Sequence, residues 1–220
     1  MNSTQILVEP EAVEGGGASR DGESAGHPRR WWVLAVLCLS LFLVVVDNTI
    51  VNVALPTLSA DLDASTTQLQ WIVDAYTLVF ASLLLAFGHF GDRFGRRGAL
   101  ALGLVLFGAT SALAAFATSA GALIGVRALM GVGAALVFPA TLAILMNVFT
   151  DKKQRAAAIG IWSGATGMAV AAGPVAGGFL LEHFWWGSVF LVNVPIVVLA
   201  VVAVMAVVPT SKDPNSGRLD

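Results

Sequence analysis

The sequence predicts an all-α, polytopic membrane protein: a bundle of six transmembrane helices. Three observations indicate this fold class. Of the 220 residues, 57% are hydrophobic and only 12% are charged, and the mean hydropathy is +0.81. These values lie outside the range of soluble globular domains. The strands of a transmembrane β-barrel need alternating apolar and polar positions, and runs such as 99–107 do not alternate.

The chain divides into a tail, a membrane region and a short polar end. Residues 1–30 scatter acidic side chains among Gly, Ser and Ala without apolar periodicity, which predicts a disordered cytoplasmic tail. The membrane region, 31–209, contains six apolar segments of the roughly 20 residues that a helix needs to cross a bilayer. Residues 210–220 are polar and are interpreted as a cytoplasmic linker or the start of a missing second half. The predicted spans are 31–56, 69–90, 98–117, 121–147, 156–181 and 188–209.

Positive charges predict the orientation of the bundle. The loops 57–68, 118–120 and 182–187 contain no Lys or Arg, whereas the opposite loops and flanks hold ten. Because Lys and Arg accumulate on the cytoplasmic side, both termini are expected in the cytoplasm of a multi-pass protein of the cell membrane. The positive residues are Arg29, Arg30, Arg93, Arg96, Arg97, Lys152, Lys153, Arg155, Lys212 and Arg218.

Composition also excludes several classes of function. A net charge of −2 gives no reason to expect nucleic acid as a partner. Cys38 is the single cysteine, so disulfides and Cys-based zinc sites within one chain are excluded, and the three histidines lack metal-ligand spacing. No P-loop and no catalytic constellation occur. We therefore expect neither an enzyme nor a metal or cofactor, and energy is expected to come from a proton gradient.

Three charged residues lie inside predicted spans: Asp47, Asp74 and Arg127. A charge at the centre of a membrane helix costs about 2.5–3.5 kcal/mol, so such residues usually face a bundle interior or a water-filled path. At a rise of ~1.5 Å per residue, all three fall ~8–13 Å below the outer surface. At matching depth they can neutralise one another, and a carboxylate there can carry a proton. A static ion pair is the alternative, and Trp71 beside Asp74 favours an interfacial position for that residue.

The turn between the second and third spans, residues 88–97, reads Gly-His-Phe-Gly-Asp-Arg-Phe-Gly-Arg-Arg. Glycine permits a sharp turn here, and the carboxylate and guanidinium groups can exchange partners between helix ends. This segment resembles motif A of the major facilitator superfamily. The matching positions are Gly88, Asp92, Arg93, Gly95, Arg96 and Arg97.

Three further segments resemble motifs of the fourteen-helix drug:proton antiporter branch of that superfamily. Residues 47–56 resemble the first-helix motif, which implies that Asp47 is protonated during transport. Residues 127–133 resemble motif B, whose arginine, here Arg127, is associated with proton coupling. The fifth span resembles motif C, associated with antiporters and with a gate between halves. Its matching positions are Gly164, Gly167, Gly173, Pro174, Gly177 and Gly178.

Glycine spacing in the fifth span also has a direct physical meaning. Glycines at helical spacing leave one face almost bare backbone, which permits close approach of another helix, and Pro174 is expected to kink the helix. Tight packing alone is the simpler interpretation of this face.

Together these features predict an antiporter that exports drugs, antibiotics or other lipophilic molecules by alternating access. Asp47 would bind and release the proton, Arg127 would tune its affinity, and Asp74 would contribute charge to the substrate cavity. Since transport sites of this architecture form between two bundles, six helices are expected to be an amino-terminal piece that needs a missing carboxy-terminal half or a second copy. The alternatives are a superfamily transporter of another solute class, or a non-transporting membrane partner or truncated inactive product.

Overall fold

The computed structural model describes residues 28–210, apart from the side chain of Phe94, and this part of the chain contains helices and no strands. Six helical stretches are long and apolar enough to cross a membrane, which confirms the predicted all-α, six-span class. The expected tail up to residue 27 and the linker 211–220 lie outside the described residues. The helices are α1 (Arg30–Asp61), α2 (Thr66–Phe94), α3 (Arg96–Ala115), α4 (Ala120–Val148), α5 (Lys152–His183), α6 (Ser188–Leu191) and α7 (Asn193–Val207).

Several helices continue beyond the apolar segments that predicted them, because polar caps rather than hydropathy determine where they begin. Ser65 starts α2 with a reciprocal capping box, in which its backbone N–H donates to Oε1 of Gln68 (2.9 Å). Ser119 and Asp151 cap α4 and α5 by accepting backbone N–H groups. In contrast, α3 ends at Ala115, two residues before the predicted span does.

The sixth span is interrupted at Val192, which separates the four-residue α6 from α7. Proline accounts for this break, since Pro195 lacks the N–H that would bond to the carbonyl of Leu191 four residues earlier. The consequence is that Asn193 lies at the first position of α7, where its side chain turns into the bundle.

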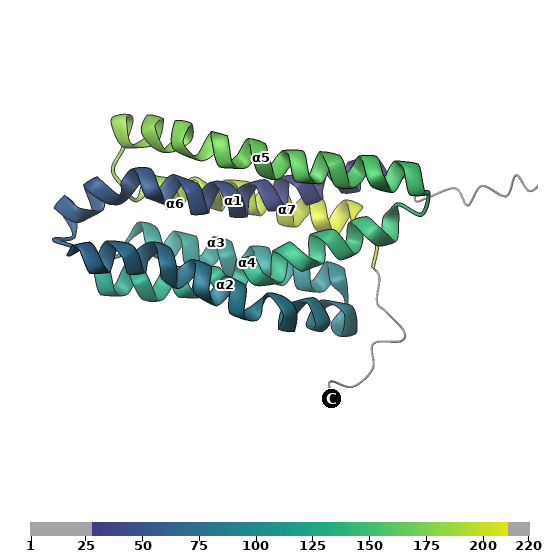
Figure 1. Ribbon diagram of the computed structural model, residues 1–220, viewed down its shortest axis with the longest axis horizontal. Coiled ribbons are helices and arrows are strands. Elements are labelled where there is room, and N and C mark those ends of the chain that lie inside the picture. The colour runs from purple at the N-terminus through teal and green to yellow at the C-terminus, as the bar shows by residue number, and fades with distance from the viewer. Residues whose placement is uncertain (1–27, 211–220) are drawn as a thin grey trace, which may run out of the picture.

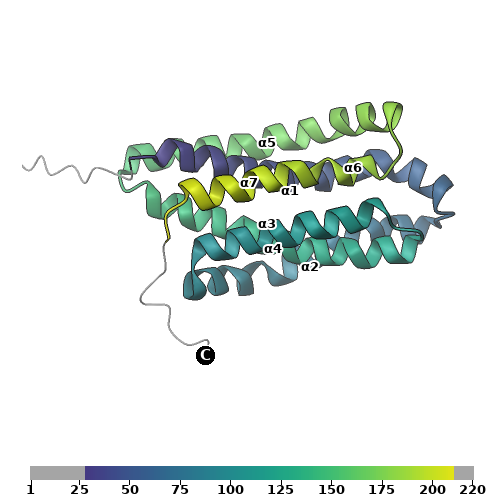
Figure 2. The same ribbon diagram turned by 180° about the vertical axis from the view of Figure 1, so that it is seen from behind.

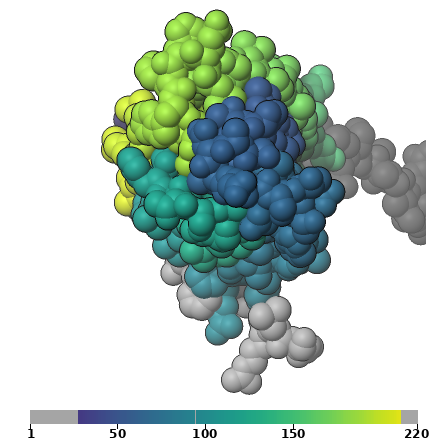
Figure 3. All heavy atoms as spheres, turned by 90° about the vertical axis from the view of Figure 1, so that its left-hand side faces the viewer, coloured from purple at the N-terminus to yellow at the C-terminus, as the bar shows by residue number. Residues whose placement is uncertain are grey.

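The helices run along the long axis in two sets, α5–α1–α7 and α2–α4–α3 (Figure 1, and from behind in Figure 2). Within each set the middle helix packs against both neighbours, and the sets meet mainly where α1 contacts α4 and where α3 contacts α7. Residues 28 and 210 both lie at one end, the right-hand end of Figure 1. The connections 62–65, 116–119 and 184–187 lie at the other end, which we call the turn end (Figure 3).

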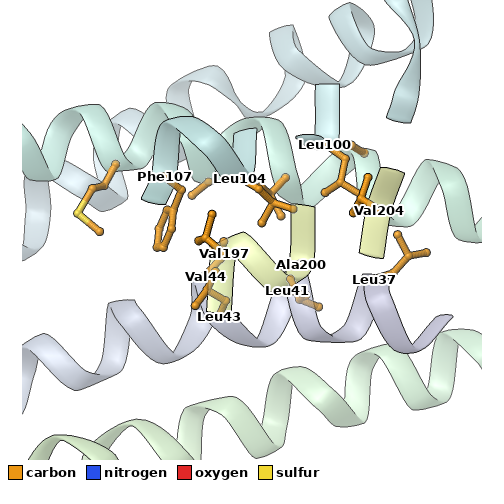
Figure 4. Packing of buried hydrophobic residues seen from close by; sticks show 14 of the residues in the cluster. Leu37, Leu41, Leu43, Val44, Leu100, Leu104, Phe107, Val197, Ala200 and Val204 are labelled. Carbon is orange, nitrogen blue, oxygen red and sulfur yellow. The ribbon is translucent and has the colours of Figure 1, made fainter. Parts of the chain in front are cut away.

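Apolar side chains of α7 fill the space between α1 and α3 (Figure 4). Val197 and Ala200 of α7 lie between Leu41 of α1 and Leu104 and Phe107 of α3, and all five are buried. In lipid, such contacts stabilise through close packing more than through removal of water. The core therefore holds α1, α3 and α7 together and fixes the helices that carry the site described next.

The two outer helices differ from the central ones in what they bury. Most of the apolar part of α1 and of α4 is buried inside the bundle, whereas most of that part of α2 and of α5 is half-buried or exposed. Exposed apolar residues include Leu78 and Leu85 on α2 and Met168 and Val175 on α5. Among the described helices, α2 and α5 thus have the smallest buried share and offer the most surface to lipid or to another protein.

Candidate functional site

Two of the three predicted intramembrane charges form a buried ion pair. Nη1 of Arg127 on α4 donates to Oδ2 of Asp47 on α1 at 2.5 Å, and neither side chain is exposed. The two residues are 80 positions apart in the chain, so this contact joins the two helix sets. Each charge compensates the other where no water reaches.

Glycines bring α4 close enough to its neighbours to place Arg127. A Cβ added at Gly131 would lie 2.6 Å from the carbonyl oxygen of Tyr76 on α2, and one added at Gly133 would lie 2.9 Å from the carbonyl oxygen of Gly103 on α3. Only glycine permits these approaches without displacement of the backbone. One turn from Gly131, Nε of Arg127 donates to the carbonyl oxygen of Ile72 at 3.1 Å.

Tyr76 is the second contact of Arg127 on α2. The guanidinium carbon lies 4.3 Å from the centre of the Tyr76 ring, in cation–π geometry. The Tyr76 hydroxyl donates to the carbonyl oxygen of Val44 on α1 at 3.2 Å. Within residues 28–210, Nη2 of Arg127 has no hydrogen-bond partner. Arg127 therefore has partners on α2 that do not depend on Asp47.

The other oxygen of Asp47 is held by a neutral network that sequence reasoning missed. Nδ2 of Asn193 on α7 donates to Oδ1 of Asp47 at 2.8 Å and to Oγ of Ser111 on α3 at 3.0 Å. Oγ of Ser111 donates in turn to the carbonyl oxygen of Phe190 at 2.8 Å. Asn193 and Ser111 are both fully or almost fully buried. Polar side chains inside apolar spans must find partners, and this property of Ser111 and Asn193 was the available signal.

Asp74 does not join this cluster. Its side chain is exposed, although Ile72 two residues earlier is buried against Arg127. Among the described residues no ion pair or hydrogen bond of the Asp74 side chain is recorded. A role for Asp74 in a substrate cavity stays a prediction, and such a cavity would have to involve the exposed face of α2.

The motif A turn lies at the end opposite the turn end. Gly95 alone separates α2 from α3 and has a φ of 118°, a conformation that favours glycine. Nε of Arg96 pairs with Oδ1 of Asp92 at 2.7 Å, and its Nη1 donates to the carbonyl oxygen of Ala143 at 3.4 Å.

The remaining motif A positions differ in burial and contacts. Nη1 of Arg97 donates to the carbonyl oxygen of Val208, just after α7, at 3.3 Å. Arg93 is exposed near the end of α2. Gly88 is half-buried, and a Cβ there would make ordinary contact with Pro139 of α4. The turn thus connects α3 to both α4 and α7 through backbone carbonyl groups.

The glycines of motif C separate into two groups. A Cβ added at Gly173 would overlap Oγ1 of Thr49, and one added at Gly177 would lie 2.9 Å from Cγ1 of Ile50, so these two positions let α5 approach α1. Pro174, between them, is exposed and lies within a continuous α5. The other three positions have no neighbouring atoms within 4 Å in the described chain: Gly164, Gly167 and Gly178. Only part of the motif therefore packs within this bundle.

Metal binding finds no support in the part of the chain that the structure describes. No group of three or more His, Cys, Asp or Glu side chains there could hold a metal ion. The chemistry available at the site is that of one carboxylate, one guanidinium and their neutral hydrogen-bond partners.

Comparison with protein families identifies the superfamily of this chain. A family model described as "Major Facilitator Superfamily" matches residues 37–219. The chain belongs to this superfamily. Its six apolar helices and the superfamily assignment together make it a multi-pass membrane protein.

Relatives of the chain are named for efflux, resistance or transport. The multidrug efflux pump LfrA of Mycolicibacterium smegmatis is 50% identical over 192 residues, which cover 87% of this chain and 38% of LfrA. The methyl viologen resistance protein SmvA of Salmonella typhimurium is 45% identical over the same shares. The riboflavin transporter RibZ of Clostridioides difficile is 37% identical over 79% of this chain and 38% of RibZ. The chain thus spans about 38% of the length of these relatives.

Proposed function

We propose that this chain supplies one helix bundle of a proton-coupled antiporter that exports lipophilic small molecules, drugs or antibiotics among them, by alternating access. The observation that carries the proposal is the fully buried Asp47–Arg127 pair. Such a pair is expensive to place in a membrane, and intramembrane carboxylates are the usual proton carriers. The name of LfrA, a multidrug efflux pump, supports export as the direction of transport.

Protonation of Asp47 would act as the switch. A neutral Asp47 no longer forms an ion pair with Arg127, which keeps its contacts with the Ile72 carbonyl oxygen and the Tyr76 ring on α2. The ion pair between α1 and α4 would then be lost while the contact between α4 and α2 remains. Since the pair connects α1 of one helix set to α4 of the other, its loss would weaken the contact between the two sets and permit one set to move against the other.

The energy source would be a proton gradient, with no cofactor. We assign the end that holds Arg96 and residues 28 and 210 to the cytoplasm, because Lys and Arg gather there and are absent from the three connections of the turn end. Arg127 then lies about 10 Å inside the start of α4 on the outer side, within reach of protons from outside the cell.

Substrate would bind between this bundle and a second one. Support comes from the exposed apolar faces of α2 and α5, from the exposed Asp74, and from the share of the relatives that the chain spans. The second bundle would be a carboxy-terminal half or a second copy of this chain. An exposed carboxylate at Asp74 would favour cationic lipophilic substrates.

The test is transport in proteoliposomes, using the chain joined to the remaining part of LfrA. We expect a pH gradient to drive export of a fluorescent lipophilic cation, and we expect Asp47→Asn to abolish that gradient-driven export while the fusion still inserts and folds. Exposed Asn147→Leu on α4 provides a control for replacement of a polar residue by an apolar one. Gradient-driven export that survives Asp47→Asn would contradict the proposal. A lower unfolding midpoint for Asp47→Asn with unchanged transport would leave the pair a purely structural contact.

A second candidate is transport of a different solute class, which the name of RibZ favours. A competition panel distinguishes the two. Inhibition of the fluorescent cation by lipophilic drugs supports the first function, whereas inhibition by riboflavin-like polar solutes alone supports the second.

A further inference from the structure

The hydrogen bonds around Asn193 have a fixed direction. The carbonyl oxygen of Phe190 can only accept, so the single hydroxyl hydrogen of Ser111 is donated to it. Oγ of Ser111 therefore faces Asn193 with a lone pair and requires an N–H there. The second N–H of the same amide nitrogen then points to Oδ1 of Asp47. A reversed amide would put its carbonyl oxygen against the carboxylate, so the orientation of Asn193 is determined by its neighbours.

This orientation makes the two oxygens of Asp47 unequal as sites for a proton. A proton on Oδ1 would face the N–H of Asn193 directly. Asn193 could accept that proton's hydrogen bond only by turning over, which would force Ser111 to abandon the buried carbonyl of Phe190. A buried carbonyl left without its partner costs about 1–3 kcal/mol.

Protonation of Oδ2 leaves the hydrogen bonds of Asn193 and Ser111 intact. A proton there displaces Nη1 of Arg127, and Arg127 retains the Ile72 carbonyl oxygen and the Tyr76 ring as partners. The guanidinium is therefore the group that can leave, and the amide is the group that cannot.

We propose that Asn193, held by Ser111, is a positioning residue that directs the proton to Oδ2 of Asp47, so that protonation and release of Arg127 become one event. The inference rests on the proposed function and deepens it: Asn193 determines whether a proton taken up at Asp47 is converted into a change between helices. Without this residue a proton on Oδ1 would neutralise Asp47 and leave Nη1 of Arg127 in place on Oδ2.

The surroundings leave Asp47 as the group through which pH acts. The other titratable side chains near it are Arg127 on α4 and Tyr76 on α2, whose hydroxyl is bonded to the Val44 carbonyl oxygen. α3 and α7 contribute the neutral Ser111 and Asn193. The stretch of α5 from residue 156 to 181 contains no titratable side chain, and neither does α6.

The experiment uses the full chain in lipid nanodiscs and two spectroscopic signals. Infrared difference spectra report the protonated carboxyl of Asp47, assigned as the band that Asp47→Asn removes. Tyr76 is the only tyrosine of the chain, so the tyrosine bands of ultraviolet Raman spectra report its contact with Arg127. In the unmodified chain we expect both signals to change with the same midpoint pH, because one proton causes both.

Asn193→Leu removes the donor at similar volume. We expect the carboxyl of Asp47 still to titrate, and the accompanying Tyr76 change to be lost, because the proton then enters Oδ1 and Arg127 stays on Oδ2. Ser111→Ala retains the amide but frees it to turn over, and we expect the same loss of the Tyr76 change. If Asn193→Leu fails to fold, Ser111→Ala alone tests the positioning role of Asn193. Exposed Asn147→Leu is the matched control, with both signals unchanged.

The outcomes separate this inference from the proposed function. Coincident carboxyl and Tyr76 changes in folded Asn193→Leu or Ser111→Ala overturn the positioning role and leave proton coupling at Asp47 intact. An Asp47 carboxyl that never titrates in the unmodified chain overturns the proposed function and the inference with it.

Discussion

Two Arg–Asp pairs in this chain have the same chemistry and opposite surroundings. Arg127 and Asp47 come from different helices, 80 positions apart, and neither side chain is exposed. Arg96 and Asp92 are four positions apart at a helix junction, with 17% and 34% of their side chains exposed. Both pairs are short contacts between a guanidinium and a carboxylate, at 2.5 and 2.7 Å.

The difference in burial decides what each pair can do. Removal of one partner from a buried pair leaves an uncompensated charge and costs about 3–5 kcal/mol, whereas a pair that water reaches typically contributes about 0.2–1 kcal/mol. The junction at Arg96 is also held by Gly95 and by a bond to a backbone carbonyl, so its shape does not depend on the pair. The buried pair is suited to a switch between states, and the junction pair to a local adjustment.

Arg127→Leu should have the largest effect. It leaves Asp47 charged and buried with only the amide of Asn193, so we expect the free energy of unfolding to fall by about 3–5 kcal/mol. Unfolding of the purified chain in mixed micelles, followed by circular dichroism, measures this change. Arg96→Leu is the matched control and should lose less than about 1 kcal/mol. Equal losses in the two variants would remove the contrast between the pairs.

Gly131→Ala tests whether close packing is what holds the buried pair in place. The added Cβ would lie 2.6 Å from a backbone oxygen of α2, which cannot yield as a flexible side chain does, so we expect a loss of about 1–3 kcal/mol. Gly125→Ala on the same helix has no atoms within 4 Å of the new Cβ, and should be neutral or stabilising by up to about 1 kcal/mol. The same unfolding assay compares them, and similar values for both would indicate that α4 is not tightly fixed against α2.

Tyr76→Phe should have a smaller effect, because it keeps the ring beside Arg127 and removes only the hydroxyl bond to the Val44 carbonyl oxygen. We expect a loss of about 0.5–1 kcal/mol. Replacement by Leu, which also removes the ring, should lose more. A Phe variant as unstable as the Leu variant would show that the cation–π contact contributes nothing measurable.

Asp92→Asn should have the smallest effect. The partly exposed pair is screened by salt, so a loss of at most about 0.5 kcal/mol at low ionic strength should vanish at 1 M NaCl. Unfolding at the two salt concentrations measures this. A loss that persists at high salt would mean that Asp92 holds the junction by geometry rather than by charge.

The sequence was sufficient for the fold and for naming both members of the buried ion pair, but not for excluding Asp74 from it. Hydropathy located six spans, and the high energy of a buried charge drew attention to Asp47 and Arg127. Depth could not decide which charges meet, because it gives position along a helix and not direction around it. Asp74 is two residues from Ile72, about 200° around the helix, and so lies away from Arg127.

The neutral members of the site escaped prediction for a different reason. Burial of Ser111 and Asn193 costs less free energy than burial of a charge, since a hydroxyl or amide can bond to a nearby carbonyl or to a single neighbour. Their importance depends on a contact between α3 and α7, which no local pattern encodes. Glycine spacing likewise predicted a bare face on α5 but not that Gly173 and Gly177 contact α1, while a Cβ at Gly164 would have no neighbour within 4 Å among residues 28–210.

The attachment of α7 to α3 at both ends has a practical consequence. Near the turn end, Ser111 of α3 is bonded to Asn193 and to the Phe190 carbonyl oxygen, and at the opposite end Arg97 is bonded to the Val208 carbonyl oxygen. Two helices fastened at both ends keep a constant separation when other helices move. Spin labels on exposed Val105 of α3 and Val198 of α7 would therefore serve as an internal ruler, against which every other interhelical distance in the bundle can be calibrated.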